Sequence, residues 1–359
     1  MKTSVRVLSL ILIAGYFILT LFLFFLPDLY ANTDLSLAVQ AVVEGKLQNL
    51  LLGVRPLLIF IAIIFPLPHS LVLSIICGIF YVFSIFVGHF LVKRMYDERT
   101  AYYFPLLWLP NAYFILNAFA PNADVPAIFA GLTIWLVTLR LLQKGNNKRQ
   151  NAELVLFGLL SGLLVLIREN VLAAVFGAFL ALFKENRSKG IIYIATALIL
   201  PTFWQLYANL FFGVSFLTQI CTGVSIATTY EYNPVKNIRY FVFGVGPLPL
   251  FSLLLGLLYD NDRNRQILIH CFLLPAVGLA LGWPAIFEPR VALIAFHALI
   301  PPSSHGLVIL IDSLKNHVLY GKRMATLIIA AIFTLNLVFN LWMAYTNNKS
   351  NFSPLWRFL

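Results

Sequence analysis

Charged side chains and cysteines are scarce in this chain of 359 residues. Charged residues make up 11% of it, whereas hydrophobic residues make up 60%. Soluble domains carry about 25% charged residues, and a soluble fold of this length could not hide so much apolar surface. The three cysteines lack metal-ligand spacing and form no disulfide framework. Soluble enzymes, disordered scaffolds and secreted disulfide modules are therefore excluded, and a polytopic helical membrane protein is favoured.

The sequence also lacks a glycine-rich loop of the kind that binds nucleotides between a strand and a helix. Its net charge is +11, but the basic residues stand in short clusters between apolar runs. This distribution is typical of membrane topology signals. We therefore expect no nucleic-acid partner.

Apolar runs of roughly bilayer length recur along the chain and predict an all-α fold with about 11 transmembrane helices. The run after Arg55 ends at Pro68, is too short to span, and predicts a juxtamembrane helix in the first outer loop. We expect one transmembrane domain over 1–359, with a core at 7–311, a last helix and outer tail at 312–359, and no separate soluble domain. The expected spans lie near 7–26, 70–92, 102–120, 125–143, 152–168, 170–183, 191–213, 240–258, 266–283, 291–311 and 324–344.

The basic residues orient these helices. With a cytoplasmic N-terminus, 17 Lys and Arg residues fall inside and 8 outside, which accounts for all 25 in the chain. An excess of basic residues in cytoplasmic loops is the rule for membrane proteins. We therefore expect a multi-pass integral membrane protein with a cytoplasmic N-terminus and an extracytoplasmic C-terminus.

Several charged residues stand at the outer ends of these helices, where charge is costly unless it is paired or used. Arginines at the headgroup level suit a phosphate group. A carboxylate beside them suits general-base chemistry or a divalent cation. The residues in question are Asp34, Arg55, Asp124, Arg168 and Arg290.

Four of these residues also have a structural alternative. Asp34 and Asp124 could cap the helices that follow them. Arg168 and Arg290 could serve as headgroup anchors. Glu169, next in the chain after Arg168, could simply neutralise it.

The order of these features resembles the GT-C membrane glycosyltransferases, which include protein O-mannosyltransferases and the aminoarabinose transferases that act on lipid A. The resemblance covers roughly residues 7–310. Leu35 differs from the pattern of this family, because many members carry a second acid at that position. The matching features are Asp34 before Gly45, Arg55-Pro56 at the juxtamembrane helix, Asp124 at the start of a helix, a glycine-rich span that ends at Arg168, and Arg290 before a proline-containing span.

The resemblance implies transfer of a hexosyl or pentosyl group, for example mannose, from a polyprenyl or dolichyl phosphate donor. It implies that Asp34 deprotonates the acceptor, with inversion at the anomeric carbon, and that Asp124 assists. Arg55, Arg168 and Arg290 would hold the lipid phosphate. Asp34 and Asp124 are the expected ligands if a divalent cation (Mg²⁺ or Mn²⁺) takes part, and no other cofactor is expected. The partners would be the lipid-linked donor, membrane lipid and a protein, lipid or glycan acceptor.

The segment from Val214 to Arg239 is the longest later outer segment, and it could be an acceptor-binding lid or a plain connector. His297, on the tenth expected span, could contact the acceptor or be a core histidine. The candidate acceptor and lid residues are Tyr230, Glu231, Tyr232, Lys236, Glu288 and His297.

Two other functions stay open at this point. A secondary transporter would use helices broken near the membrane midplane, and the prolines Pro247/Pro249 and Pro301/Pro302 could break helices there. A non-catalytic GT-C-like assembly subunit is favoured by Leu35.

Overall fold

The computed structural model describes residues 34–47, 52, 55–109, 111, 123–143, 150–214, 234–282, 289–317 and 321–347. Within these ranges the regular elements are helices and no β-strand occurs, so the predicted all-α fold is confirmed. The expected first span at 7–26 lies outside the described residues, as do 112–120 of the expected span 102–120.

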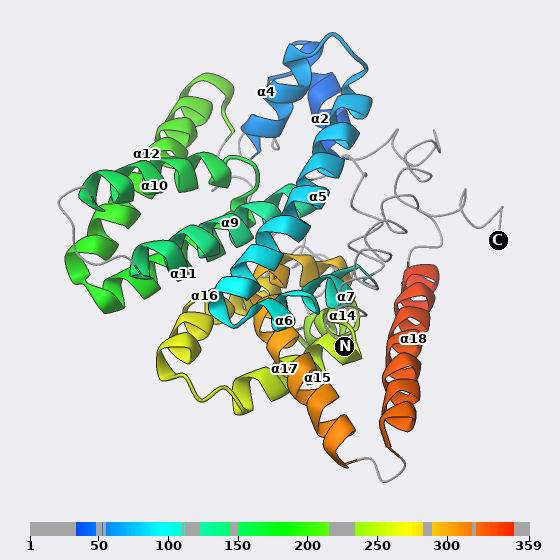
Figure 1. Ribbon diagram of the computed structural model, residues 1–359. Helices are drawn as coiled ribbons and strands as arrows, with labels where there is room; N and C mark the ends of the chain where they lie inside the picture. Colours follow the sequence, from blue (N-terminus) through cyan, green and yellow to red (C-terminus); the bar gives the residue numbers. More distant parts are fainter. Residues whose placement is uncertain are drawn as a thin grey trace.

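The helices follow one another along the chain with short connections between most of them (Figure 1). Two of the helices in the described ranges are 3-10 helices, η2 (Glu169–Val171) and η3 (Pro289–Ile294). The α-helices are α2 (Asp34–Val43), α4 (Pro56–Ile64), α5 (His69–Met95), α6 (Glu98–Ala101), α7 (Phe104–Trp108), α9 (Asp124–Gln143), α10 (Gln150–Val165), α11 (Leu172–Glu185), α12 (Arg187–Phe212), α14 (Pro234–Val245), α15 (Pro247–Leu258), α16 (Arg263–Gly282), α17 (Phe296–His317) and α18 (Gly321–Asn347).

Four of the described helices, α5, α9, α12 and α16, are long and apolar enough to cross a membrane. A fifth span results if α14 and α15, which meet at a bend of 93°, count as one. The chain is thus an integral membrane protein, but the predicted number of 11 spans is not confirmed. Helices α10 and α11 have 16 and 14 residues, fewer than the roughly 20 that a bilayer requires. Helix α4 has nine residues, as expected for the short run after Arg55.

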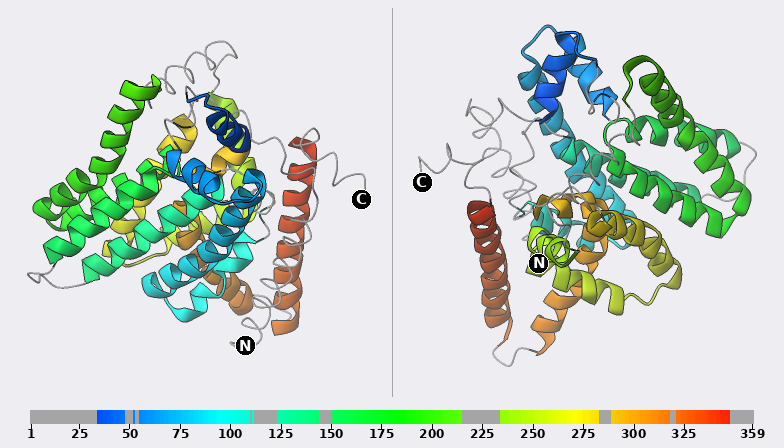
Figure 2. Two further views of the ribbon diagram at one scale, coloured as in Figure 1. Left: turned by 90° about the horizontal axis from the view of Figure 1, so that it is seen from above. Right: turned by 180° about the vertical axis from the view of Figure 1, so that it is seen from behind.

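Helix α9 is central to the arrangement, with α5 on one side and α11 on the other. Helices α10 and α12 pack on each other beyond α11, and α15 packs along α17 (Figure 2). Helices α2 and α4 lie together at one end of α5 (Figure 1). This places the predicted juxtamembrane helix beside the first turn of a long span.

The buried side chains form two clusters. The larger one fills the space around α9 and includes Trp135, whose ring stacks on Phe272 with centroids 4.7 Å apart. The smaller one joins α2 and α4 to the start of α5, and it also takes in Ala123 and Ile167 from other parts of the chain. The second cluster therefore connects the juxtamembrane helices to the beginning of α9 and the end of α10.

Glycines allow the closest contacts between helices. A Cβ atom at Gly306 of α17 would lie 1.7 Å from the carbonyl oxygen of Ser252 in α15. A Cβ atom at Gly131 of α9 would lie 2.5 Å from Cγ of His297. Side chains at these positions would clash, so the glycines determine how closely α15 meets α17 and where the His297 ring fits.

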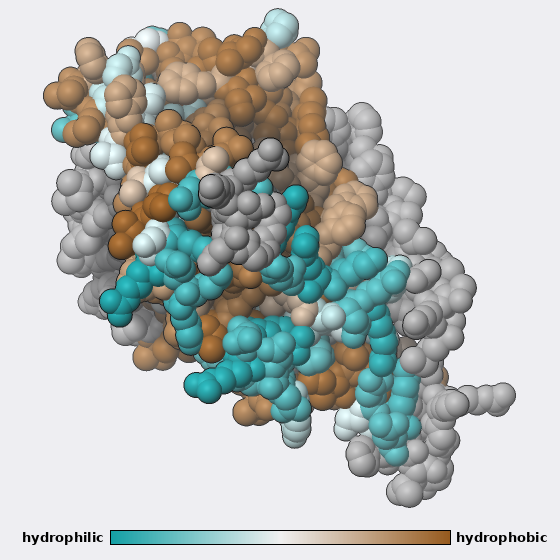
Figure 3. Space-filling model, turned by 60° about the vertical axis from the view of Figure 1, so that its left-hand side comes forward, coloured by the Kyte–Doolittle hydropathy of each residue, from teal (hydrophilic) through white to brown (hydrophobic). Residues whose placement is uncertain are grey.

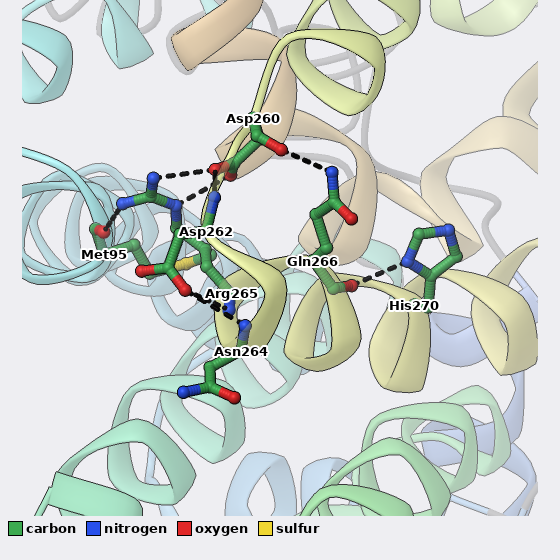
Figure 4. A network of polar contacts seen from close by, with 7 residues as sticks. All are labelled: Met95, Asp260, Asp262, Asn264, Arg265, Gln266 and His270. Atoms are coloured by element: carbon green, nitrogen blue, oxygen red, sulfur yellow. Dashed lines mark hydrogen bonds and ion pairs between the residues drawn. The ribbon is translucent and has the colours of Figure 1, made fainter.

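A network of polar contacts joins the segment before α16 to the end of α5 (Figure 4). Arg265 donates from Nε and Nη2 to the two carboxylate oxygens of Asp260, both at 2.7 Å, and from Nη1 to the Met95 carbonyl oxygen at 2.8 Å. Burial raises the pKa of Asp260, but the hydrogen bonds from Arg265 outweigh this effect and the pKa lies below its usual value. The loop before α16 is thereby joined to the last turn of α5.

The surface agrees with a membrane location. The face in Figure 3 is hydrophobic over much of its upper part, and hydrophilic side chains gather in a band across its middle and lower part. Large apolar side chains are also exposed on the spans, for example Phe86 on α5 and Phe203 on α12. Exposed apolar patches of this extent mark a surface that faces lipid or a partner rather than water.

Candidate functional site

The start of α4 is attached to the turn that follows α10. The backbone N–H of Leu57 donates to the carbonyl oxygen of Leu166 at 3.2 Å. Pro56 occupies the first helical position, where its missing N–H costs no intrahelical hydrogen bond. Arg55, the residue just before α4, is therefore held beside η2, which starts at Glu169.

Arg55 and Glu169 form a bidentate ion pair. Nε of Arg55 donates to Oε2 of Glu169 at 3.2 Å, and Nη2 donates to Oε1 at 3.0 Å. The side chains are 13% and 4% exposed. Burial raises the pKa of Glu169, but the attraction of the Arg55 and Arg168 guanidinium groups outweighs burial and lowers the pKa below its usual value. The carboxylate is therefore held in its ionised form.

Arg168 and Asp124 form a second, deeper ion pair. Nη1 of Arg168 donates to Oδ1 of Asp124, and both side chains are buried. Asp124 is the first residue of α9, where the positive end of the helix dipole favours a carboxylate. Because Arg168 and Glu169 are neighbours in the chain, the two pairs form one buried group of four charges.

Glu169 pairs with Arg55 and Arg168 pairs with Asp124, while the charge of Arg168 still acts on the Glu169 carboxylate. Arg168 has extended backbone angles, φ −163° and ψ 140°, and successive side chains of an extended backbone point to opposite sides. Glu169 therefore reaches Arg55, and Arg168 reaches Asp124. The sequence did not predict the pairing of Arg55 with Glu169. The available indication was an acid directly after Arg168 in a tight turn.

Asp34 begins α2, and its side chain is outside the described part of the structure. Its neighbour Leu35 belongs to the smaller buried cluster, together with Ala123 and Ile167. These three residues directly adjoin Asp34, Asp124 and Arg168 in the sequence. The three predicted charges thus stand on backbone positions that border one cluster.

The other predicted site residues fall in three groups. Arg290 lies in η3 and Lys236 in α14, and nothing is described of their side chains. His297 is buried in the larger core against Gly131, which fits the alternative of a core histidine. The remaining candidates, Tyr230, Glu231, Tyr232 and Glu288, lie outside the described residues.

The expected metal site has little support among the described side chains. Within the described ranges, no group of three or more His, Cys, Asp or Glu residues could hold a metal ion. The Asp124 carboxylate contacts a guanidinium group, which is an unfavourable neighbour for a cation. Only one of the two expected ligands, Asp124, has a described side chain, because that of Asp34 lies outside the described part.

Comparison with known proteins identifies the fold. No protein-family model and no curated protein matches the sequence. ArnT from Cupriavidus metallidurans in the apo state is similar in structure, with a TM-score of 0.58 and 12% identity over 85% of this chain and 60% of that one. Its structure bound to undecaprenyl phosphate also has a TM-score of 0.58 at 12% identity, over 82% of this chain and 60% of that one.

A second similar structure is the Archaeoglobus fulgidus oligosaccharyltransferase in the apo form, with a TM-score of 0.55 and 14% identity over 98% of this chain and 55% of that one. Both proteins belong to the GT-C superfamily. The chain spans little more than half the length of either. The fold thus resembles that of GT-C membrane proteins, in agreement with the resemblance found in the sequence.

Proposed function

We propose that this protein is a membrane glycosyltransferase that moves a sugar from a polyprenyl- or dolichyl-phosphate carrier to an acceptor at the extracytoplasmic membrane surface. The fold supports this class, because the similar ArnT structure was solved with undecaprenyl phosphate, a carrier lipid of this kind. The observation that carries the proposal is the site itself. Asp124, Arg168, Glu169 and Arg55 form one buried charged group, and the first turn of α2, with Asp34, borders the same apolar cluster.

The proposed reaction is an inverting substitution. Asp34 accepts a proton from the acceptor, whose nucleophilic atom forms a bond to the anomeric carbon. The bond between that carbon and the phosphate oxygen breaks, and the lipid phosphate leaves as an anion. Guanidinium groups fixed beside the leaving oxygen stabilise the charge that develops there. Arg55 and Arg168 are positioned for this role by Glu169 and Asp124, and Arg290 is the third proposed phosphate ligand.

Asp124 has a different role here from a general base. Its carboxylate contacts Arg168, so it orients the guanidinium group that receives the phosphate. A side chain held by a buried partner needs little reorganisation when charge develops. Residues Tyr230, Glu231, Tyr232, Lys236 and Glu288 remain the proposed acceptor contacts, and a metal at Asp34 and Asp124 is not part of this mechanism.

The test is transfer from a synthetic polyprenyl-phosphate sugar in reconstituted vesicles. We expect Asp34→Asn to lose transfer at least 100-fold, which is about the effect of losing general-base catalysis. Asparagine begins helices as well as aspartate does, so this variant separates the base from a capping role. Glu44→Gln is the matched control, because Glu44 is an exposed acid at the end of α2. Full transfer by Asp34→Asn would remove the central assignment.

Arg55→Ala tests the phosphate role separately. We expect it to weaken donor binding more than it slows the step that follows, and the readout is the donor concentration at half-maximal rate. Unchanged donor affinity would rule out this role for Arg55.

A secondary transporter is the second candidate function. It is favoured by the 93° bend between α14 and α15 at Gly246, which has a positive φ of 89°. Broken helices of this kind line substrate sites in transporters. The second predicted break is absent, because α17 runs through Pro301 and Pro302. Uptake of substrate into vesicles without sugar transfer would favour this candidate.

A further inference from the structure

A groove lies between α5 and α9, near the end of α9 that is opposite Asp124. Arg140 follows Asp124 by sixteen residues on α9, so the helical rise of 1.5 Å per residue separates them by roughly 24 Å. That distance approaches the thickness of a bilayer core. The groove has a volume of about 510 Å³ and is lined by Phe90, Lys93, Arg94, Leu136, Val137 and Arg140.

Positive charge dominates one part of the groove. Lys93 and Arg94 lie in the last turn of α5, and Arg140 in the last turn of α9, and all three side chains are exposed. Among the described residues, Arg94 and Arg140 form no ion pair with an acid, and Lys93 is 3.9 Å from Glu98. The groove therefore attracts an anion, because its cations outnumber the acids nearby.

Apolar side chains line the other part. Phe90 precedes Lys93 and Arg94 by about one turn of α5, and Leu136 and Val137 precede Arg140 by about one turn of α9. Phe90 is 56% exposed. On both helices the order is the same, with apolar residues toward the middle of the span and basic residues toward its end. The lining thus matches a molecule with an anionic head and an apolar tail.

We propose that this groove binds the phosphate group of an anionic membrane phospholipid, with an acyl chain against Phe90, Leu136 and Val137. Basic pockets between transmembrane helices recognise such headgroups, and guanidinium groups pair with phosphate oxygens in a fork-like geometry. Arg94 is already oriented, since its Nε donates to Oε1 of Gln143 on α9 at 2.7 Å. The bound lipid fastens α5 to α9 at the membrane surface away from the candidate active site.

The test uses the full-length protein, purified in a neutral detergent and titrated with phosphatidylglycerol, phosphatidylcholine or inorganic phosphate. The thermal unfolding midpoint gives the apparent affinity, because a ligand that binds only the folded state raises it. We expect phosphatidylglycerol to raise the midpoint, and phosphatidylcholine and inorganic phosphate not to do so. Arg94→Gln/Arg140→Gln should weaken the apparent affinity for phosphatidylglycerol roughly tenfold or more.

The matched control is Arg187→Gln/Arg263→Gln. These arginines are exposed, open α12 and α16, and lie outside the groove. This control removes the same charge and should keep the affinity of the unmodified protein. The proposal is overturned if the groove variant keeps its affinity, or if the control loses as much. An equal rise with inorganic phosphate would assign the groove to a free anion and would also overturn it.

Discussion

The buried pair of Arg168 and Asp124 gives the sharpest test of the site's energetics. The two side chains are only 9% and 3% exposed. Removing one partner of a buried ion pair costs about 3 to 5 kcal/mol, because the remaining charge loses its compensation inside the protein. We therefore expect Arg168→Gln to lower the free energy of unfolding by about 3 kcal/mol. A surface ion pair contributes about 1 kcal/mol or less.

The double variant distinguishes an ion-pair effect from loss of packing. Asp124→Asn/Arg168→Gln places two neutral amides where this pair stood, so neither position keeps a buried charge that has lost its partner. The double variant should lose less free energy of unfolding than Asp124→Asn and Arg168→Gln lose in sum, and the difference should be about 2 kcal/mol or more. The assay is equilibrium unfolding in mixed detergent micelles, followed by the fluorescence of the six tryptophans. The reasoning would be refuted if the loss in the double variant equalled the sum of the two single losses to within about 0.5 kcal/mol.

Two further predictions concern pH and packing. The pKa of Glu169 in the folded protein lies below its usual value of 4.5. The ionised carboxylate therefore stabilises the fold at pH values above 4.5. This stabilisation is lost as the pH falls through the pKa of the folded protein. Glu169→Gln should therefore flatten the decline of the thermal midpoint between about pH 5 and about pH 3, and an unchanged slope would contradict the pKa shift. Gly306→Ala should destabilise the protein by about 1 to 3 kcal/mol, since its Cβ would meet the Ser252 carbonyl oxygen. Gly278→Ala is the control, because among the described residues no atom beyond its own stretch of helix lies within 4 Å of an added Cβ. Equal thermal midpoints for these two variants would be the contrary result.

The long apolar helices were predictable because hydropathy is a local property. The run predicted at 125–143 is α9 (Asp124–Gln143), and the run at 70–92 is α5 (His69–Met95). The run at 240–258 was predicted as one span, yet it divides at Gly246 into α14 and α15. Its apolar composition continues across the break, so hydropathy does not register it. The prolines on either side of Leu248 were the available signal.

The candidate site was predictable only in part. The charges at Asp124, Arg55 and Arg168 stood out because ionised residues are rare at the ends of apolar helices. Their pairing did not follow from the sequence, since Arg168 and Asp124 are 44 residues apart. Which side chains meet depends on how α4, α9 and η2 are placed around the smaller cluster. That placement depends on the packing of residues such as Ile167 and Ala123, and the spacing of residues in one sequence does not encode it.

The charged group also constrains how the protein is made. Arg55 leaves the ribosome 114 residues ahead of its partner Glu169, a wait of roughly 6 to 23 seconds at ordinary rates of translation. Asp124 is likewise synthesised 44 residues before its partner Arg168. During biogenesis these early charges must stay in water, or near lipid headgroups, until the turn after α10 has been synthesised. The segment around Arg55 and the start of α9 can therefore take their final places only after the nascent chain has passed that turn.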